Sequence, residues 1–334
     1  MSNVTQSKVA IEAHELVKTY GGKVRALDGL SFSVEAGSIF ALLGPNGAGK
    51  STTIKILNTL SRPDSGFATV AGFDVLREPE AVRRAIGCVA QKSGVDNEAT
   101  GRENLTLQGK IYGLRGQELK TRVDDLLTRF RLAEAANSVA RTYSGGMQRK
   151  LDIAMGLVHR PQVLFLDEPT TGLDPEARAS LWEDIAKLSR EDGITVLLTT
   201  HYLEEADQLA QRLAIVDHGR LIVEGGPEQL KGELFGDAIH IEFAHAETES
   251  KVREAFGGLD GISEIRVEGH SLHARASQGA TAVPGMLVAL ESAGLKVASV
   301  TVARPSLDDV YLRYTGRTFS EAEMGDQKGQ KGTR

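Results

Sequence analysis

An α/β fold with two domains is predicted for these 334 residues by three observations. Two apolar runs, at residues 163–166 and 194–200, lack polar alternation, as is typical of strands in a parallel sheet that is covered on both faces. A glycine-rich loop at 44–52 lies between an apolar strand pattern and a helical pattern. After residue 226 the strand and helix patterns begin again, which predicts a second domain.

The first domain, residues 1–226, begins with strand patterns at 9–20 and 25–34. Further short strands are expected at 69–72 and 86–91. Residues 100–160 then form a helical subdomain, which a capping-box pattern opens at Thr100 and Glu103. The predicted elements that complete this domain are a helix at 182–190 and a hairpin with strands at 212–216 and 220–223. We therefore expect a parallel core with an antiparallel β subdomain and a helical insert.

The sequence patterns of the second domain, residues 227–316, predict a strand, a helix, two strands, a helix and a strand, in that order. The segments are 239–243, 249–256, 262–267, 271–276, 284–293 and 296–303. This order is typical of small α+β, ferredoxin-like domains. A regulatory or dimerising role and a purely stabilising one both fit it. The polar tail at 317–334 is predicted to be disordered.

The composition of the chain limits the classes of function that it can have. The net charge of −6 offers no general attraction to nucleic acid or to anionic lipid. We find no signal-peptide pattern at the N-terminus and no apolar run long enough to span a membrane, so any spanning part would come from another chain. The single cysteine, Cys88, favours a reducing compartment and is expected to be a small buried hydrophobe.

The glycine-rich loop fits the spacing G-x-x-x-x-G-K-[ST]. It consists of Gly44, Pro45, Asn46, Gly47, Ala48, Gly49, Lys50, Ser51 and Thr52. Backbone amides in such a loop point inward at the start of a helix and form a phosphate-binding nest. Lys50 is expected to reach the β- and γ-phosphates, and Ser51 to offer a hydroxyl to Mg²⁺. The loop therefore predicts binding of a nucleoside triphosphate.

Two acids, Asp167 and Glu168, end the apolar strand at 163–166. Alone, such a pair is more often a solvated strand edge than a site. Together with a phosphate loop, Asp167 is placed to hold Mg²⁺ and Glu168 to orient or deprotonate the water that attacks the γ-phosphate.

The segment 143–149, Tyr-Ser-Gly-Gly-Met-Gln-Arg, resembles the signature sequence of the ATP-binding subunits of ABC transporters. Ser144, Gly145 and Gly146 of this segment begin a second helix, and its N-terminus is a further element that suits phosphate binding. An ordinary helix cap is the alternative. The resemblance implies a head-to-tail homodimer in which this segment of one chain completes the ATP site of the other.

Other positions match this family one at a time. The resemblance implies that Tyr20 stacks on adenine and that Gln91 contacts Mg²⁺ or water and senses the membrane partner. It also implies that Asp174 communicates with the opposite site and that His201 contacts the γ-phosphate. The alternatives are an edge tyrosine, a loop glutamine, a simple turn and a structural histidine.

Tyr143 and Met147 depart from the commoner leucine and glutamine of the signature, as in the branch of daunorubicin/doxorubicin-resistance ATP-binding proteins. The segment 305–312 also resembles a motif of that branch, with Tyr311 in place of the usual phenylalanine. The resemblance to ABC proteins spans about residues 8–226, and the branch assignment extends to about 316.

The resemblance thus implies an ATPase that uses ATP and Mg²⁺ and drives export of a hydrophobic compound or drug. It would act at the cytoplasmic face of the cell membrane, through separately encoded permease subunits, without nucleic acid. A lipid or polysaccharide exporter would use the same ATPase sequence. A soluble ABC ATPase of ribosomes or DNA is disfavoured by the single phosphate loop and the acidic balance.

Overall fold

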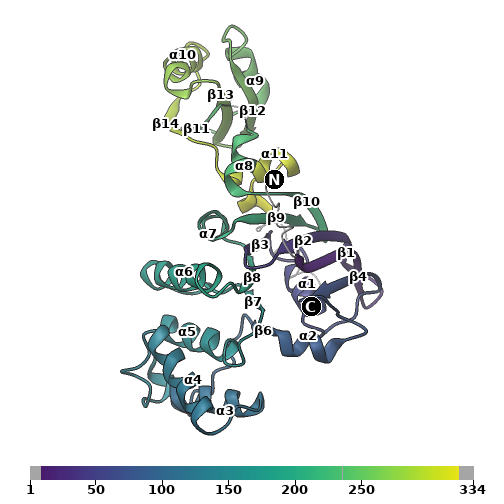
Figure 1. The fold of residues 1–334 in the computed structure, drawn as a ribbon. Helices are drawn as coiled ribbons and strands as arrows, with labels where there is room; N and C mark the ends of the chain where they lie inside the picture. Colours follow the sequence, from purple (N-terminus) through teal and green to yellow (C-terminus); the bar gives the residue numbers. More distant parts are fainter. Residues whose placement is uncertain (1–8, 235, 323–334) are drawn as a thin grey trace, which may run out of the picture. The chain divides into compact units, whose positions relative to one another are not determined.

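The computed structural model describes residues 9–234 and 236–322, and these residues form two units (Figure 1). The first unit contains residues 9–227 and 320–322, and the second contains Glu228–Phe319. A buried hydrophobic cluster lies within each unit. Each unit therefore has a core of its own.

A six-stranded, mainly parallel sheet is the centre of the first unit. Its strands, in spatial order, are β10 (Arg220–Gly225), β9 (Arg212–Asp217), β3 (Ile39–Leu43), β8 (Thr195–Thr200), β7 (Val163–Asp167) and β6 (Ile86–Val89). All residues of β3 and β8 are buried, which agrees with their continuous apolar character. Figure 1 shows α6 (Pro175–Arg190) and α7 (Leu203–Leu209) on one side of this sheet and α1 (Lys50–Leu57) on the other. Because β3, β7 and β8 are parallel, the residues that follow them meet at one edge of the sheet.

A four-stranded antiparallel sheet forms the rest of the β structure in this unit. Its strands, in spatial order, are β2 (Val24–Glu35), β1 (Val9–Tyr20), β4 (Ser65–Val70) and β5 (Phe73–Asp74). Phe32 of β2 stacks on Phe40 of β3 with ring centroids 5.5 Å apart. The two sheets therefore share one hydrophobic core, which also contains Ile54 and Leu57 of α1.

The helical subdomain contains α3 (Gly101–Ile111), α4 (Gly116–Arg129), a 3₁₀ turn at Ala140–Thr142 and α5 (Gly145–Gly156). The predicted capping box is present: Thr100 caps α3, and the Glu103 carboxylate accepts a hydrogen bond of 2.8 Å from the Thr100 amide. The buried residues of α4 recur at helical spacing and are Leu119, Val123, Leu126 and Leu127.

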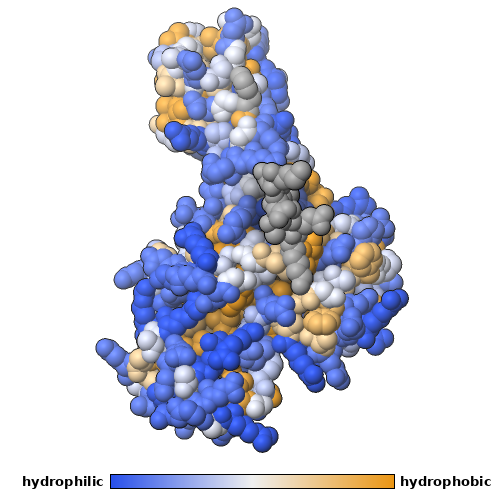
Figure 2. Space-filling model, viewed as in Figure 1, coloured by the Kyte–Doolittle hydropathy of each residue, from blue (hydrophilic) through white to orange (hydrophobic). Residues whose placement is uncertain are grey.

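The second unit contains a four-stranded antiparallel sheet. Its strands, in spatial order, are β12 (Ile262–Glu268), β13 (Ser271–Ala276), β11 (Asp237–Phe243) and β14 (Val297–Ala303). Its helices are α9 (Glu249–Ala255), α10 (Gly279–Ser292) and α11 (Leu307–Thr315), and α8 (Pro227–Gly232) precedes the sheet. The apolar face of the sheet packs against α9 and α10. Figure 2 shows hydrophobic residues at the surface over α10 and β14, where Val288 and Val302 are exposed.

Several helices differ from the prediction. α6 begins at Pro175, well before residue 182, because Asp174 caps it and proline suits the first helical position. α2 (Pro79–Ala85), α7 and α11 were not predicted as helices. The first two have only seven residues each, too few for helical periodicity to show.

Two further predictions need correction. Cys88 is exposed and not buried; it lies on β6, the strand at one end of the six-stranded sheet. Residues 319–322, within the tail predicted to be disordered, are helical. The Phe319 ring is buried against that of Tyr311, at 4.9 Å between centroids, and this burial stabilises the start of the segment. The rest of the predicted tail, 323–334, lies outside the described residues.

Candidate active site

The glycine-rich loop connects β3 to α1. Gly47 and Gly49 have positive φ angles of 82° and 106°, which non-glycine residues rarely adopt. A Cβ at Gly49 would lie 2.5 Å from the Ala26 carbonyl oxygen, and one at Gly44 would lie 2.2 Å from that of Val216. Backbone conformation therefore requires glycine at 47, lack of space requires it at 44, and both require it at 49.

Lys50, the first residue of α1, is buried with 4% of its surface exposed. Its Nζ donates hydrogen bonds to the carbonyl oxygens of Gly44 at 2.7 Å and Pro45 at 3.0 Å. It also lies 3.8 Å from Oε1 of Glu168. The ammonium group is thus held inside the curve of the loop, facing the acidic end of β7.

Asp167 ends β7 beside the loop. Its Oδ1 accepts hydrogen bonds from the hydroxyls of Ser51 at 3.2 Å and Thr199 at 2.6 Å. Thr199 belongs to the neighbouring parallel strand β8, where it is paired with Asp167 in register. Sequence analysis gave Thr199 no role, because a threonine within a buried strand carries no local signal.

Glu168 is the centre of the site. Gln91 Nε2 donates to its Oε2 at 3.0 Å, Thr171 Oγ1 donates to the same oxygen at 3.3 Å, and His201 Nδ1 lies 3.2 Å from its Oε1. Its φ of +47° is a left-handed conformation that is strained for a non-glycine residue and is common at functional sites. Burial alone would raise the pKa of Glu168, but His201, Lys50 and Thr171 together hold it below the ordinary value. The group is therefore a carboxylate at neutral pH.

Comparison with known proteins decides the family. A family model described as ABC transporter matches residues 27–171. The daunorubicin resistance ATP-binding protein DrrA3 of Streptomyces coeruleorubidus is 45% identical over 307 residues, which cover 92% of this chain and 96% of that protein. The chain belongs to the ABC transporter family. It is an ATPase subunit of that family, as the phosphate loop and the acidic strand end predicted.

Other ABC proteins extend the comparison. The Nod factor export ATP-binding protein I of Sinorhizobium fredii is 41% identical, with 95% of this chain and 89% of that protein covered. An ATP-binding cassette in its ADP conformation has a TM-score of 0.61 at 26% identity, covering 67% of this chain and 93% of that one. A dimeric cassette in a post-hydrolysis state bound to ADP and Pi has a TM-score of 0.59 at 27% identity, covering 65% and 98%.

The predicted signature residues of this ABC ATPase form a second cluster. Ser144 caps α5 through Met147 and Asp174 caps α6 through Ala177. A Cβ at Gly146 would lie 3.0 Å from that of Ala177, so the two helix N-termini pack closely. A Cβ at Gly145 would likewise lie 3.5 Å from Cδ2 of Leu173. Ser144, Gly145 and Asp174 are thus exposed close together, and Gly146 is buried beside them against α6.

The remaining predicted site residue, Tyr20, ends β1 and is 41% exposed, with the Lys18 ammonium 5.5 Å from its ring centre. An exposed ring of this kind is available for stacking.

Sequence analysis missed Arg149 and Asp152, although both lie within or just after the signature segment. Arg149 is buried and donates to the carbonyl oxygens of Ala90 at 2.7 Å, Asp167 at 3.0 Å and Pro169 at 2.8 Å. Asp152 accepts a hydrogen bond of 2.9 Å from the Gly94 amide. The only available signal was the placement of charged residues on an otherwise buried helix.

Sequence analysis also gave no role to Glu205. It is fully buried and accepts hydrogen bonds from Thr170 Oγ1 at 2.8 Å and Trp182 Nε1 at 3.1 Å. These contacts join the helix after His201 to the segment after Glu168.

Proposed function

We propose that this ABC ATPase powers export of a hydrophobic compound, such as a drug, through separately encoded membrane permease subunits. The observation that carries the proposal is the identity of 45% with a daunorubicin resistance protein over 92% of the chain. A linearmycin resistance ATP-binding protein of Bacillus subtilis, 36% identical over 93% of the chain, supports the same cargo class. Within the described residues no helix has the length and apolar character needed to cross a membrane. We place the subunit at the cytoplasmic face of the membrane, bound to the permease, because its relatives are ATP-binding proteins of drug resistance.

In this proposal Lys50 and the amides of residues 44–52 bind the phosphates of ATP. The oxygens of Ser51 and Asp167 and the amide of Gln91 suit a hard cation such as Mg²⁺. No described group of three or more His, Cys, Asp or Glu side chains could hold a metal alone, so phosphate oxygens would supply the other ligands. Bound Mg²⁺ would neutralise phosphate charge. Tyr20 would stack on adenine.

Glu168 is proposed as the residue that orients or deprotonates the attacking water, with His201 beside the γ-phosphate. The support is geometric: Gln91, Thr171, His201 and Lys50 all approach one carboxylate and fix its orientation. The lowered pKa of Glu168 keeps it ionised, as a base must be before it accepts a proton.

The active form is proposed to be a head-to-tail homodimer. In each chain the cluster formed by Ser144, Gly145, Gly146 and Asp174 would complete the ATP site of the other chain. A structural relative in a dimeric state bound to ADP and Pi supports this arrangement. ATP binding would join the two subunits, and hydrolysis would release them.

Inverted membrane vesicles that contain the chain and the permease encoded beside its gene test the proposal. We expect ATP-dependent accumulation of daunorubicin, and none with the Glu168→Gln variant or with a non-hydrolysable ATP analogue. ATP hydrolysis without accumulation of any tested drug would contradict the cargo class while leaving the ATPase assignment intact.

One relative favours a second cargo. The Nod factor export ATP-binding protein I is 41% identical over 95% of the chain, which lies within the range of 36% to 45% found for the resistance proteins. The same vesicles, assayed with Nod factor in competition with daunorubicin, distinguish the two classes of cargo. Accumulation of Nod factor alone would favour a lipid or polysaccharide cargo.

A further inference from the structure

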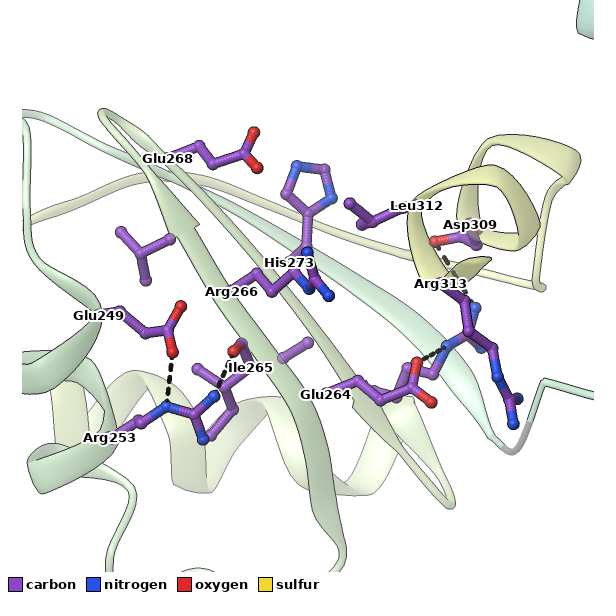
Figure 3. A pocket seen from close by; sticks show the side chains of 13 residues that line it. Glu249, Arg253, Glu264, Ile265, Arg266, Glu268, His273, Asp309, Leu312 and Arg313 are labelled. Atoms are coloured by element: carbon purple, nitrogen blue, oxygen red, sulfur yellow. Dashed lines mark hydrogen bonds and ion pairs between the residues drawn. The ribbon is translucent and has the colours of Figure 1, made fainter. Parts of the chain in front are cut away.

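A cavity of about 480 Å³ lies in the second unit, far in sequence from the residues of the ATP site. Figure 3 shows that strands β12 and β13 form its floor, with α9 on one side and α11 on the other. The cavity opens on the polar face of the sheet, where Arg266 of β12 is paired in register with His273 of β13, and His273 with His240 of β11. The opposite face is the one that packs against α9 and α10.

The acidic side chains around the cavity are largely engaged already. Glu249 pairs with Arg253 at 2.8 Å, and Glu264 pairs with Nε of Arg275 at 3.1 Å. Asp309 uses Oδ2 to cap α11, accepting from the Ser306 amide at 2.8 Å, and its Oδ1 lies 3.6 Å from Nη2 of Arg275. Glu268, the fourth acidic residue that lines the cavity, also has an interaction partner. The carboxylates at the cavity are therefore engaged by other groups.

Several nitrogen atoms at the cavity, in contrast, are only partly satisfied by the groups around them. Among the described residues, Arg266 and Arg313 line the cavity and form no ion pair, and each donates only to a carbonyl oxygen, of Gly316 and Glu233 respectively. Nη2 of Arg275, whose side chain is 5% exposed, is buried and makes no hydrogen bond. The same is true of Nδ1 of His273. Buried polar nitrogens of this kind are costly unless a ligand satisfies them.

The backbone beside the cavity is strained in a way that orients Arg275. Glu264 has a φ of +51° and lies where the register of β12 against β13 shifts. Bulges of this type redirect a side chain at functional positions. Here the redirected Glu264 carboxylate holds Nε of the Arg275 guanidinium, while Nη2 makes no hydrogen bond and has only Oδ1 of Asp309 nearby, at 3.6 Å.

We infer that this cavity binds a small anion, a carboxylate or a phosphate group, between Arg266, Arg275 and His273. Planar guanidinium groups bind both kinds of anion through paired hydrogen bonds, and an imidazole nitrogen adds a further donor. Arg313 on α11 supplies additional positive charge at the rim.

Titration calorimetry of the full chain with inorganic phosphate and, separately, with citrate tests the inference. Because phosphate could also enter the glycine-rich loop, both titrations use the Lys50→Ala variant as the parent protein. We expect saturable binding of at least one probe at millimolar concentrations or below. Binding of phosphate alone or of citrate alone identifies which anion the cavity prefers, and either result supports the inference.

Variants of single residues locate the binding. Arg266→Gln and His273→Gln, added to the parent, should each weaken binding at least about tenfold, as expected for loss of one charge-assisted hydrogen bond. Arg253→Gln is the matched control, because that arginine is already paired with Glu249 and should retain the affinity of the parent. Circular dichroism checks that all three variants are folded. The inference is overturned if neither probe binds, or if Arg266→Gln and His273→Gln bind as tightly as the parent.

Discussion

The guanidinium of Arg149 donates a hydrogen bond of 2.7 Å to the carbonyl oxygen of Ala90, and this bond joins the helix that begins at Ser144 to the residue before Gln91. One turn further along the same helix, Asp152 holds the amide of Gly94 at 2.9 Å. The helix thus forms hydrogen bonds with both ends of the segment 90–94, which carries Gln91. Arg149 also binds the carbonyl oxygens on either side of Glu168, those of Asp167 and Pro169. Displacement of the signature helix would therefore be transmitted to Gln91 and Glu168, two groups of the proposed ATP site.

Arg149→Lys tests this connection. Lysine keeps the charge but cannot bind three carbonyl oxygens in the fixed geometry of a guanidinium, so we expect kcat for ATP hydrolysis to fall at least about tenfold, about 1.4 kcal/mol. ATP affinity should change little, because Arg149 does not belong to the phosphate loop. Arg141→Lys is the matched control, since the exposed pair between Arg141 and Glu98 makes no contact with this segment. A rise in KM without a fall in kcat would contradict the proposed positioning role.

Glu168→Gln should separate ATP binding from hydrolysis. The amide preserves the size of the side chain but cannot accept a proton, so turnover should fall at least about a hundredfold. Binding of ATP, followed by fluorescence of a labelled analogue, should persist. Hydrolysis near the wild-type rate would remove Glu168 from this role.

Gly49→Ala should damage both stability and ATP binding. The added Cβ would meet the Ala26 carbonyl oxygen at 2.5 Å, at a residue whose φ is +106°. We expect a loss of unfolding free energy of roughly 2 kcal/mol or more and no measurable ATP binding. Gly72→Ala provides the comparison, because Gly72 also has a positive φ but has open space around it, and it should lose only about 1 kcal/mol. Equal losses of stability and binding in the two variants would show that the loop tolerates the side chain.

Glu205 gives the pH dependence of stability a defined sign. Burial raises the pKa of Glu205 above its ordinary value, and the hydrogen bonds from Thr200, Thr170 and Trp182 only partly offset this. The folded state therefore holds this proton more tightly than the unfolded chain. This contribution to stability is complete below the ordinary glutamate pKa and is lost as the pH rises through the raised one.

Glu205→Gln keeps an oxygen acceptor for Thr170 and Trp182 without the charge. Relative to the wild type, its unfolding free energy should rise progressively as the pH is increased from acidic to neutral. Urea unfolding at a series of pH values measures this difference. Glu204→Gln, at an exposed position, should show no such trend. Parallel curves for Glu205→Gln and the wild type would contradict the raised pKa.

Local motifs explain how much of the site could be predicted. The residues of the loop that carries Lys50 are contiguous in sequence, and so are the two acids at the end of β7. The spacing within each motif therefore predicts the roles of its residues. Thr199, Arg149 and Glu205 reach the site only through neighbouring strands or through helices packed across the sheet, and no local pattern marks them. Continuous apolar runs likewise predicted β3, β7 and β8, whereas the short helices α2 and α7 depend on tertiary contacts.

The central claim is that Ser144 of one chain faces the phosphate loop of the other. A variant with Cys88→Ser and Glu168→Gln, carrying Asn46→Cys and Ser144→Cys, tests this directly, because Cys88 is the only native cysteine. Under mild oxidation with MgATP we predict a disulfide-linked dimer on non-reducing gels, and far less of it without nucleotide. Thiols that stay free with MgATP, or a disulfide closed within a single chain, would contradict the account.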